Sequence, residues 1–163
     1  MIRSNPFSSD ASGRLLIEDA VFATLNPYRQ FSPSAPESGG ILLGFRRGQH
    51  LHIVEATVPS KLDKRSRFGF YRQAASHQKI ALQRWRESGE TMDYMGEWHS
   101  HPEDVPHPSG TDLRNWLDIT VPRDDPMVFI IIGRRNDWIG VSLGVEVIGS
   151  RLSLKEGDLR GKS

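Results

Sequence analysis

The chain has 163 residues, enough for one domain that buries a sizeable core. Its formal charge of +1, from 21 basic and 20 acidic side chains, excludes a field that would recruit nucleic acid or an anionic membrane. The absence of cysteine excludes disulfides, thiolate metal sites and cysteine-protease chemistry. We find neither a signal peptide nor an apolar run that would span a bilayer, so we expect a soluble cytoplasmic protein.

The first half of the chain begins with a segment rich in Ser, Asn, Pro and Gly. We expect a loose lead-in at residues 1–13, followed by one domain at residues 14–158. In chain order, the patterns then predict a strand at 14–17, a helix at 18–25, strands at 41–45 and 50–58, and a polar, basic loop at 61–67. The helix ends before Pro27, because a residue that precedes proline avoids the helical conformation.

The second half predicts two helices among apolar strands. A helix at 71–86 would bury Tyr71, Ala75, Gln78, Leu82 and Trp85, and a second, at about 109–119 with Ser109 as its N-cap, would bury Leu113, Trp116 and Leu117. Strands are predicted at 91–98, at 127–132 with burial on both faces, at 138–148 and at 151–154. The fold class is therefore mixed α/β (α+β), a single domain with a largely antiparallel central sheet and two or three helices.

The chemistry of the chain is concentrated in residues 99–112. His99 and His101 are two residues apart on a predicted strand, so their side chains face one point. Asp112, in the first turn of the next helix, can reach the same point. Two imidazoles and a carboxylate suit zinc, and three protein ligands with an open fourth position are typical of a catalytic site. The alternative is two surface histidines beside an ordinary helix cap, which the full spacing disfavours.

The series His-Ser-His-Pro, six residues, Ser, two residues and Asp resembles the JAMM motif of the JAB/MPN metalloproteases. That motif also requires a glutamate just before a Gly-rich strand, and Glu37, followed by Ser-Gly-Gly-Ile-Leu-Leu-Gly, matches it. The resemblance covers residues from about 15 to 148. It implies a single JAB/MPN-like fold with one Zn²⁺ per chain.

The resemblance also implies a role for each signature residue. His99, His101 and Asp112 bind the zinc, Glu37 acts as base toward the attacking water and protonates the leaving amine, and Ser109 donates a hydrogen bond to the oxyanion. A hydroxyl can cap a helix and still donate its proton elsewhere. A purely structural cap is the alternative for Ser109.

Other polar residues are weaker candidates. Glu97 shares a strand face with the two histidines and is a rival base. We expect His50 and His52 to face solvent, which disfavours a second metal site, and His77 to lie on the surface, while Trp98 belongs to the core. His107, Glu103 and Asp104 lie between the metal ligands, where substrate contact and plain solvation are equally plausible.

Within the JAB/MPN family, the segments Pro-Glu-Ser-Gly-Gly-Ile-Leu-Leu-Gly and Gly-Glu-Trp-His-Ser-His-Pro resemble a compact bacterial branch. Its members occur in integrative elements and in CBASS anti-phage operons, beside a fused ubiquitin-activating and ubiquitin-conjugating-like enzyme and a cGAS-like nucleotidyltransferase. The resemblance implies cleavage of the bond formed at the C-terminus of that nucleotidyltransferase. The alternatives are a peptidase for another ubiquitin-like or sulfur-carrier tail, and a non-catalytic scaffold.

Overall fold

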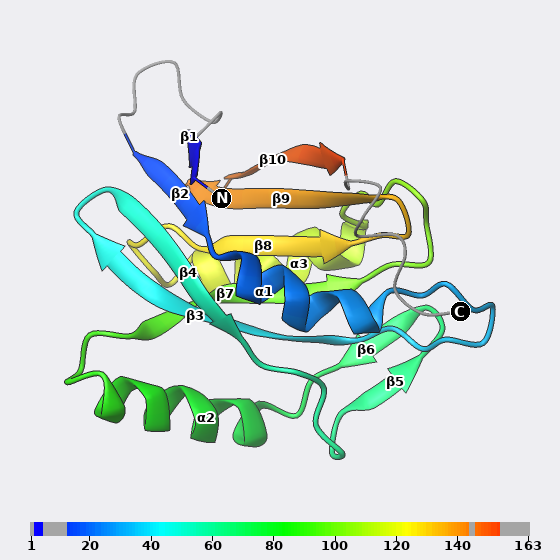
Figure 1. Ribbon diagram of the computed structural model, residues 1–163, viewed down its shortest axis with the longest axis horizontal. Coiled ribbons are helices and arrows are strands. Elements are labelled where there is room, and N and C mark those ends of the chain that lie inside the picture. The colour runs from blue at the N-terminus through cyan, green and yellow to red at the C-terminus, as the bar shows by residue number, and fades with distance from the viewer. Residues whose placement is uncertain (1, 5–12, 144–145, 154–163) are drawn as a thin grey trace.

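A single eight-stranded sheet forms the centre of the computed structural model, which describes residues 2–4, 13–143 and 146–153 (Figure 1). The strand order is β1-β2-β4-β3-β7-β8-β9-β10. The strands are β1 (Ile2–Ser4), β2 (Arg14–Ile17), β3 (Gly39–Arg47), β4 (His50–Ala56), β7 (Asp93–Ser100), β8 (Val128–Ile132), β9 (Asn136–Leu143) and β10 (Glu146–Ser153). Only β2 with β4 and β7 with β8 pair in parallel. The predicted mixed, largely antiparallel sheet is therefore confirmed.

Helices cover the sheet on both faces (Figure 1). Helix α1 (Asp19–Leu25) packs on one face and α3 (Gly110–Thr120) on the other, while α2 (Ala74–Glu87) contacts β3 and β7. A 3₁₀ turn (Asn26–Tyr28) follows α1. None of the helices in the described part of the chain is long and apolar enough to cross a membrane.

Strand β8 is the hydrophobic centre of the molecule, as its continuous apolar sequence predicts. Val128, Ile130 and Ile132 point into the cluster beneath α1. Phe129 and Ile131 point into the cluster beneath α3. All five side chains are fully buried, because a strand with helices on both faces of its sheet leaves no solvated side.

In two regions the observed strands differ from the predicted ones. The predicted loop at 61–67 contains β5 (Lys64–Ser66), which pairs with β6 (Gly69–Tyr71) in a separate two-stranded sheet. The predicted strand 138–148 is in fact two antiparallel strands, with Leu143 paired to Glu146. The predicted strand 151–154 is the end of β10 as far as residue 153. Of the lead-in 1–13, residues 2–4 form β1, and residues 1 and 5–12 lie outside the described part of the chain.

The helices also differ from their predicted packing. Helix α2 buries the face that carries His77, whereas Leu82 and Trp85 of the predicted apolar face are 46% and 37% exposed. The predicted buried face of this helix is wrong, because the hydrogen bonds of His77, rather than buried apolar side chains, hold the helix in place. In α3, Trp116 is buried as predicted, but Leu113 is 40% exposed.

His77 is buried in a polar network, which contradicts the predicted surface position. Its Nδ1 lies 2.6 Å from Thr57 Oγ1, and its Nε2 lies 3.0 Å from Asp63 Oδ2. Asp63 also accepts backbone N–H groups of Ser60 and Gln73 at 2.7 and 2.6 Å. These bonds join the loop after β4 to the start of α2.

We expect Asp63→Asn to lower the free energy of unfolding by about 1–3 kcal/mol at pH 7, since it weakens a buried charge-assisted network. Burial raises the pKa of Asp63, but the bonds from Gln73, His77 and Ser60 outweigh it and lower the pKa below 3.8. This contribution is therefore present above pH about 4 and is lost as the pH falls through the folded-state pKa. Urea unfolding at pH 7 and pH 3 measures it, with the exposed Asp118→Asn as control; equal losses at both pH values would contradict it.

Candidate metal centre and cleft

The register between β3 and β7 determines which residues meet at the site. Gly39 pairs with His99 and Gly40 with Trp98 in an antiparallel ladder. The ladder continues past β3, where Ser100 N donates to Ser38 O at 2.8 Å. One residue further, Glu37 therefore comes opposite His101, although the two are far apart in the sequence.

A bulge in β7 brings the site residues onto one face of the sheet. The register of β3 with β7 shifts between Leu42 and Leu43, opposite Gly96. Gly96 has φ of +142°, and a Cβ there would lie 1.8 Å from Val128 O, so only glycine fits. Beyond the bulge, Trp98 points into the core beneath α1, whereas His99 packs near Trp116 of α3, their ring centroids 5.9 Å apart.

The three predicted metal ligands lie together. His99 Nε2 and His101 Nε2 are 3.0 Å apart, and Asp112 places Oδ1 3.3 Å from the first and Oδ2 3.4 Å from the second. Tetrahedral zinc with bonds of about 2.0–2.1 Å separates its ligand atoms by about 3.3 Å. The donor set and its spacing therefore fit a zinc ion, and within the described residues this is the one such group of His, Cys, Asp and Glu.

Glu103 orients one of the predicted ligands, a role that sequence spacing did not identify. Its Oε2 lies 3.0 Å from His101 Nδ1. A carboxylate on Nδ1 favours the tautomer with the proton on that nitrogen, which leaves Nε2 free to bind a metal. The signal available in the sequence was only a carboxylate two residues after a ligand histidine.

The N-terminus of α3 holds the third ligand in place. Ser109 Oγ accepts the N–H of Asp112 at 3.1 Å, and Asp112 Oδ2 accepts the N–H of Ser109 at 2.6 Å. This is the predicted capping box, and it fixes the Asp112 carboxylate beside the histidines. The Ser109 oxygen acts as acceptor in the box, and the hydroxyl still has one proton to donate.

The carboxylates create a place that favours positive charge. Burial opposes ionisation of Asp112, but bonds to His101, His99 and Ser109 hold its pKa well below the usual range. Burial also opposes a charge on His101, yet Asp112, Glu103 and Glu37 raise its pKa. A cation is therefore stabilised among these groups.

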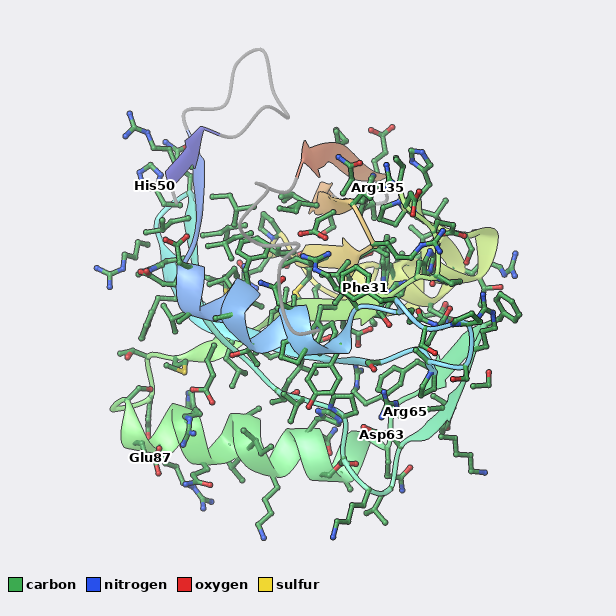
Figure 2. The ribbon with its side chains drawn as sticks, turned by 45° about the vertical axis from the view of Figure 1, so that its right-hand side comes forward. Phe31, His50, Asp63, Arg65, Glu87 and Arg135 are labelled. Atoms are coloured by element: carbon green, nitrogen blue, oxygen red, sulfur yellow. The ribbon has the colours of Figure 1, made fainter. Side chains whose placement is uncertain are left out.

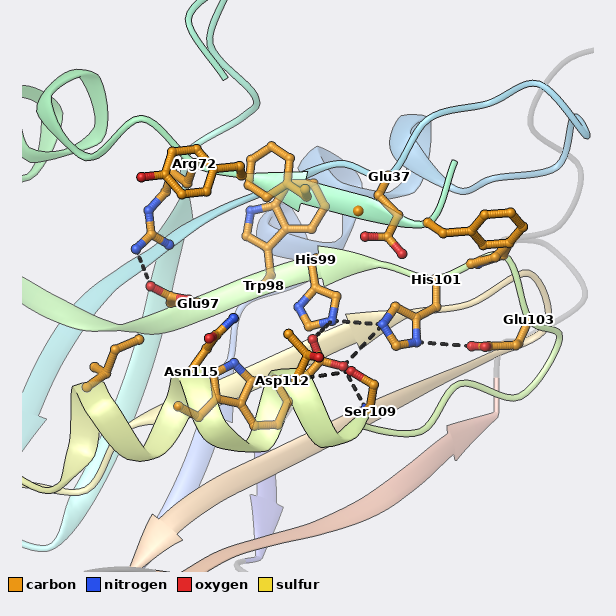
Figure 3. A pocket seen from close by; sticks show the side chains of 18 residues that line it. Glu37, Arg72, Glu97, Trp98, His99, His101, Glu103, Ser109, Asp112 and Asn115 are labelled. Carbon is orange, nitrogen blue, oxygen red and sulfur yellow. Dashed lines mark hydrogen bonds and ion pairs between the residues drawn. The ribbon is translucent and has the colours of Figure 1, made fainter. Parts of the chain in front are cut away.

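Glu37 faces the histidines from the wall opposite Asp112 (Figure 3). It is 9% exposed, and burial raises its pKa from 4.5 to about 7; the charges of Asp112 and Glu103 act in the same direction, whereas His101 lowers it. A carboxyl group with a pKa near neutral pH suits proton transfer in both directions. Glu37 thus has the burial and the placement of a general acid–base.

The site lies in an open cleft of about 670 Å³. Residues 68–72 of the β5–β6 hairpin form one wall and α3 the other, with β7 as the floor (Figure 3). Glu37, His99, His101, Ser109 and Asp112 all line it. The structure thus brings every predicted site residue into one cleft.

Glu97 lines the same cleft but is engaged elsewhere. Its Oε1 forms an ion pair with Arg72 and accepts the Tyr94 hydroxyl at 3.1 Å. Figure 3 shows this pair on the side of the cleft away from Glu37. The contacts favour Glu37 over Glu97 as the base.

The remaining histidines lie outside the centre. His50 is exposed, and His52 Nε2 lies 2.7 Å from Glu18 Oε1. Figure 2 shows His50 at the far side of the molecule from Asp63 and Arg65. His107 is exposed and does not line the cleft, and Trp98 is in the core as predicted.

A buried network behind the metal ligands connects them to Glu37. Ser100, fully buried between the two histidines, accepts Ser38 N–H at 2.9 Å and donates to Gln30 Oε1 at 3.1 Å. The Gln30 amide in turn donates to Ala35 O and Arg67 O, both at 3.0 Å. The network thus connects β7, the segment before β3 and the hairpin.

Residues 29–143 match the family model described as prokaryotic homologs of the JAB domain. Three similar proteins carry the name CD-NTase/cGAS isopeptidase. That from Escherichia coli is 40% identical over 82% of this chain and 85% of its own, that from Pseudomonas aeruginosa 45% over 72% and 77%, and that from Vibrio cholerae 37% over 82% and 85%. A solution structure from Desulfitobacterium hafniense shares the fold, with a TM-score of 0.60 and 21% identity over 87% of this chain and 93% of that one.

We expect Ser100→Ala to cost about 1–3 kcal/mol of unfolding free energy, since it leaves Ser38 N–H and Gln30 Oε1 without this partner in a buried place. Ser100→Thr keeps the hydroxyl and should cost less. Chemical denaturation of both variants measures the difference. Equal losses would show that side-chain volume, rather than the hydrogen bonds, determines the stability here.

Proposed function

Because the chain belongs to the family of prokaryotic JAB-domain proteins, we propose that it is a zinc-dependent isopeptidase. Its substrate is a cGAS-like nucleotidyltransferase joined through its C-terminus to another protein, as in ubiquitin-like conjugation. Cleavage would reverse or prime that conjugation in bacterial anti-phage defence. The observation that carries the proposal is the convergence of His99, His101 and Asp112 with buried Glu37 in one cleft. The names of the relatives support the substrate.

In this mechanism, His99, His101 and Asp112 would hold one zinc ion per chain. Zinc in such a site lowers the pKa of water to about 7 and so supplies a nucleophile at neutral pH. Glu37 accepts the proton of the attacking water as its oxygen adds to the substrate carbonyl. The same carboxyl group then gives that proton to the nitrogen as the C–N bond breaks.

Ser109 completes the reaction centre from the α3 wall. Its hydroxyl lines the cleft and donates its remaining proton to the oxyanion that forms on the substrate carbonyl. Glu103 keeps the imidazole of His101 oriented through Nδ1. Glu103 therefore positions His101 and Ser109 stabilises the oxyanion, whereas Glu37 transfers the proton.

The cleft favours an extended polypeptide as substrate. It is open along the hairpin and α3, so a flexible C-terminal tail can lie across the ligands. Gly39 and Gly40 serve internal packing on the floor of this region rather than contact with a substrate. A Cβ at Gly39 would lie 2.7 Å from the Phe70 ring, and one at Gly40 would lie 2.2 Å from Thr57 O.

We expect one zinc per purified chain and loss of that zinc in His101→Ala, since removal of one of three ligands destroys the site. His107→Ala, which changes an exposed histidine outside the cleft, should keep its zinc. Elemental analysis of the three proteins measures this. Equal zinc in wild type and His101→Ala would place the metal elsewhere and remove the basis of the mechanism.

The proposed reaction is tested with a nucleotidyltransferase joined through its native tail to a reporter protein. We expect cleavage at the junction and a loss of about 10²–10⁴ in rate for Glu37→Ala with zinc retained, because a general acid–base contributes that much. Glu97→Ala should be much milder. Mass spectrometry of the products and zinc analysis of each variant are the measurements.

A scrambled tail serves as the substrate control. Efficient cleavage of the scrambled fusion would make the protein a general metallopeptidase, and preference for an unrelated ubiquitin-like or sulfur-carrier tail would change its substrate. Absence of zinc and of any cleavage would favour the scaffold alternative. Loss of turnover in Glu97→Ala with an almost silent Glu37→Ala would reverse the assignment of the base.

A further inference from the structure

The β5–β6 hairpin has one face fixed to the rest of the molecule. Arg65 Nε donates to Glu37 O at 2.9 Å, and Ser66 O accepts Glu37 N–H at 2.6 Å. Phe70, the cross-strand partner of Arg65, packs against Gly39. Figure 2 shows Asp63 and Arg65 where the hairpin adjoins the body of the molecule. The hairpin is therefore a wall of the cleft that hydrogen bonds and packing hold in place.

The hairpin and the segment just before it carry apolar side chains that the fold does not cover. Phe68 is 75% exposed, Tyr71 68% and Leu62 67%. Among the large apolar side chains of the described residues, only Val121, at 62%, comes close to these values. Exposed apolar side chains gathered in so short a segment indicate an interaction surface.

The same segment is the most basic part of the chain. Residues 61–72 contain Lys61, Lys64, Arg65, Arg67 and Arg72 against one acidic residue, Asp63, in a protein whose net charge is +1. Asp63 is buried and bonded to His77, so it does not offset the surface charge. Lys61 and Lys64 are exposed, and within the described part of the chain no salt bridge engages them.

We propose that this hairpin rim, residues 61–72, binds an acidic, extended segment of the conjugated nucleotidyltransferase, next to the scissile bond. Carboxylates of that segment pair with Lys61 and Lys64, and an apolar side chain contacts Phe68 and Tyr71. The inference rests on the proposed function, because it takes the occupant to be the polypeptide that the cleft cleaves.

Continuity with the cleft identifies this occupant. Phe68 and Tyr71 belong to the exposed surface. They also line the cleft, together with Glu37 and the three predicted metal ligands. Lys64 is the cross-strand partner of Tyr71, so a polypeptide that leaves the metal centre along the hairpin wall and contacts Tyr71 lies close to a lysine. Charge at the rim of a binding site increases the association rate and contributes to the selection of the partner.

Basic residues interleaved with aromatic ones also suit single-stranded nucleic acid. We favour the acidic polypeptide because the chain as a whole is nearly neutral, with a net charge of +1, whereas proteins that bind nucleic acid carry a marked excess of basic charge. Nucleic acid is therefore an outcome for the experiment to decide rather than part of the proposal.

The test measures binding to the Glu37→Ala protein by fluorescence anisotropy. The probe is a labelled 12-residue peptide of Asp, Glu and Leu, compared with the same peptide carrying Asn and Gln. Lys61→Glu/Lys64→Glu should weaken binding of the acidic probe by at least about tenfold, and added salt should weaken it further. Phe68→Ala should weaken both peptides. Lys79→Glu/Arg86→Glu on the exposed face of α2 is the matched control and should bind like the parent protein.

The conjugate assay separates this inference from the proposed function. In otherwise wild-type protein, Lys61→Glu/Lys64→Glu should raise KM for the conjugate with kcat and zinc content unchanged. An unchanged KM, equal binding of the two peptides, an equal effect of the α2 control, or displacement of the acidic probe by a single-stranded oligonucleotide at lower concentration would overturn the inference. Charge-dependent binding without any conjugate cleavage would support the surface and contradict the proposed function.

Discussion

The pairing of β3 with β7 is the constraint on which the rest of the site depends. It places Glu37 opposite His101, since each step along one antiparallel strand is matched by a step along the other. A slip of one residue would turn Glu37 or the histidines to the other face. The bulge at Gly96 and the buried hydroxyl of Ser100 stabilise this register, so residues remote from the chemistry determine whether acid–base and ligands meet.

The same placement creates an electrostatic conflict that a cation resolves. Glu37, Glu103 and Asp112 gather around two imidazoles in a half-buried cleft, where like charges repel and desolvation penalises each ionised group. The raised pKa of Glu37 is one sign of this conflict. A divalent ion bound by His99, His101 and Asp112 would offset the excess negative charge and would leave Glu37, on the opposite wall, to exchange protons as proposed.

Much of the centre could be predicted from the sequence because its signals are local. The spacing of His99 and His101 on a strand, and the capping box of Ser109 and Asp112, depend on neighbours only a few residues away. Glu37 needed a family resemblance, since nothing in local spacing indicates a pairing between distant strands. His77 was mistaken for a surface residue because its partners, Thr57 and Asp63, lie in a loop whose path only the fold determines.

The hairpin was the part least accessible to sequence reasoning and has the most direct connection to Glu37. Each of its strands is only three residues long, which is too short to show the alternation of apolar and polar residues that identifies a strand. Yet Ser66 and Arg65 hold the main chain of Glu37 on both sides of its Cα, through its N–H and its C=O. A polypeptide bound at the hairpin rim would therefore also restrict the position of Glu37, and in the proposed mechanism substrate recognition and proton transfer would depend on the same hairpin.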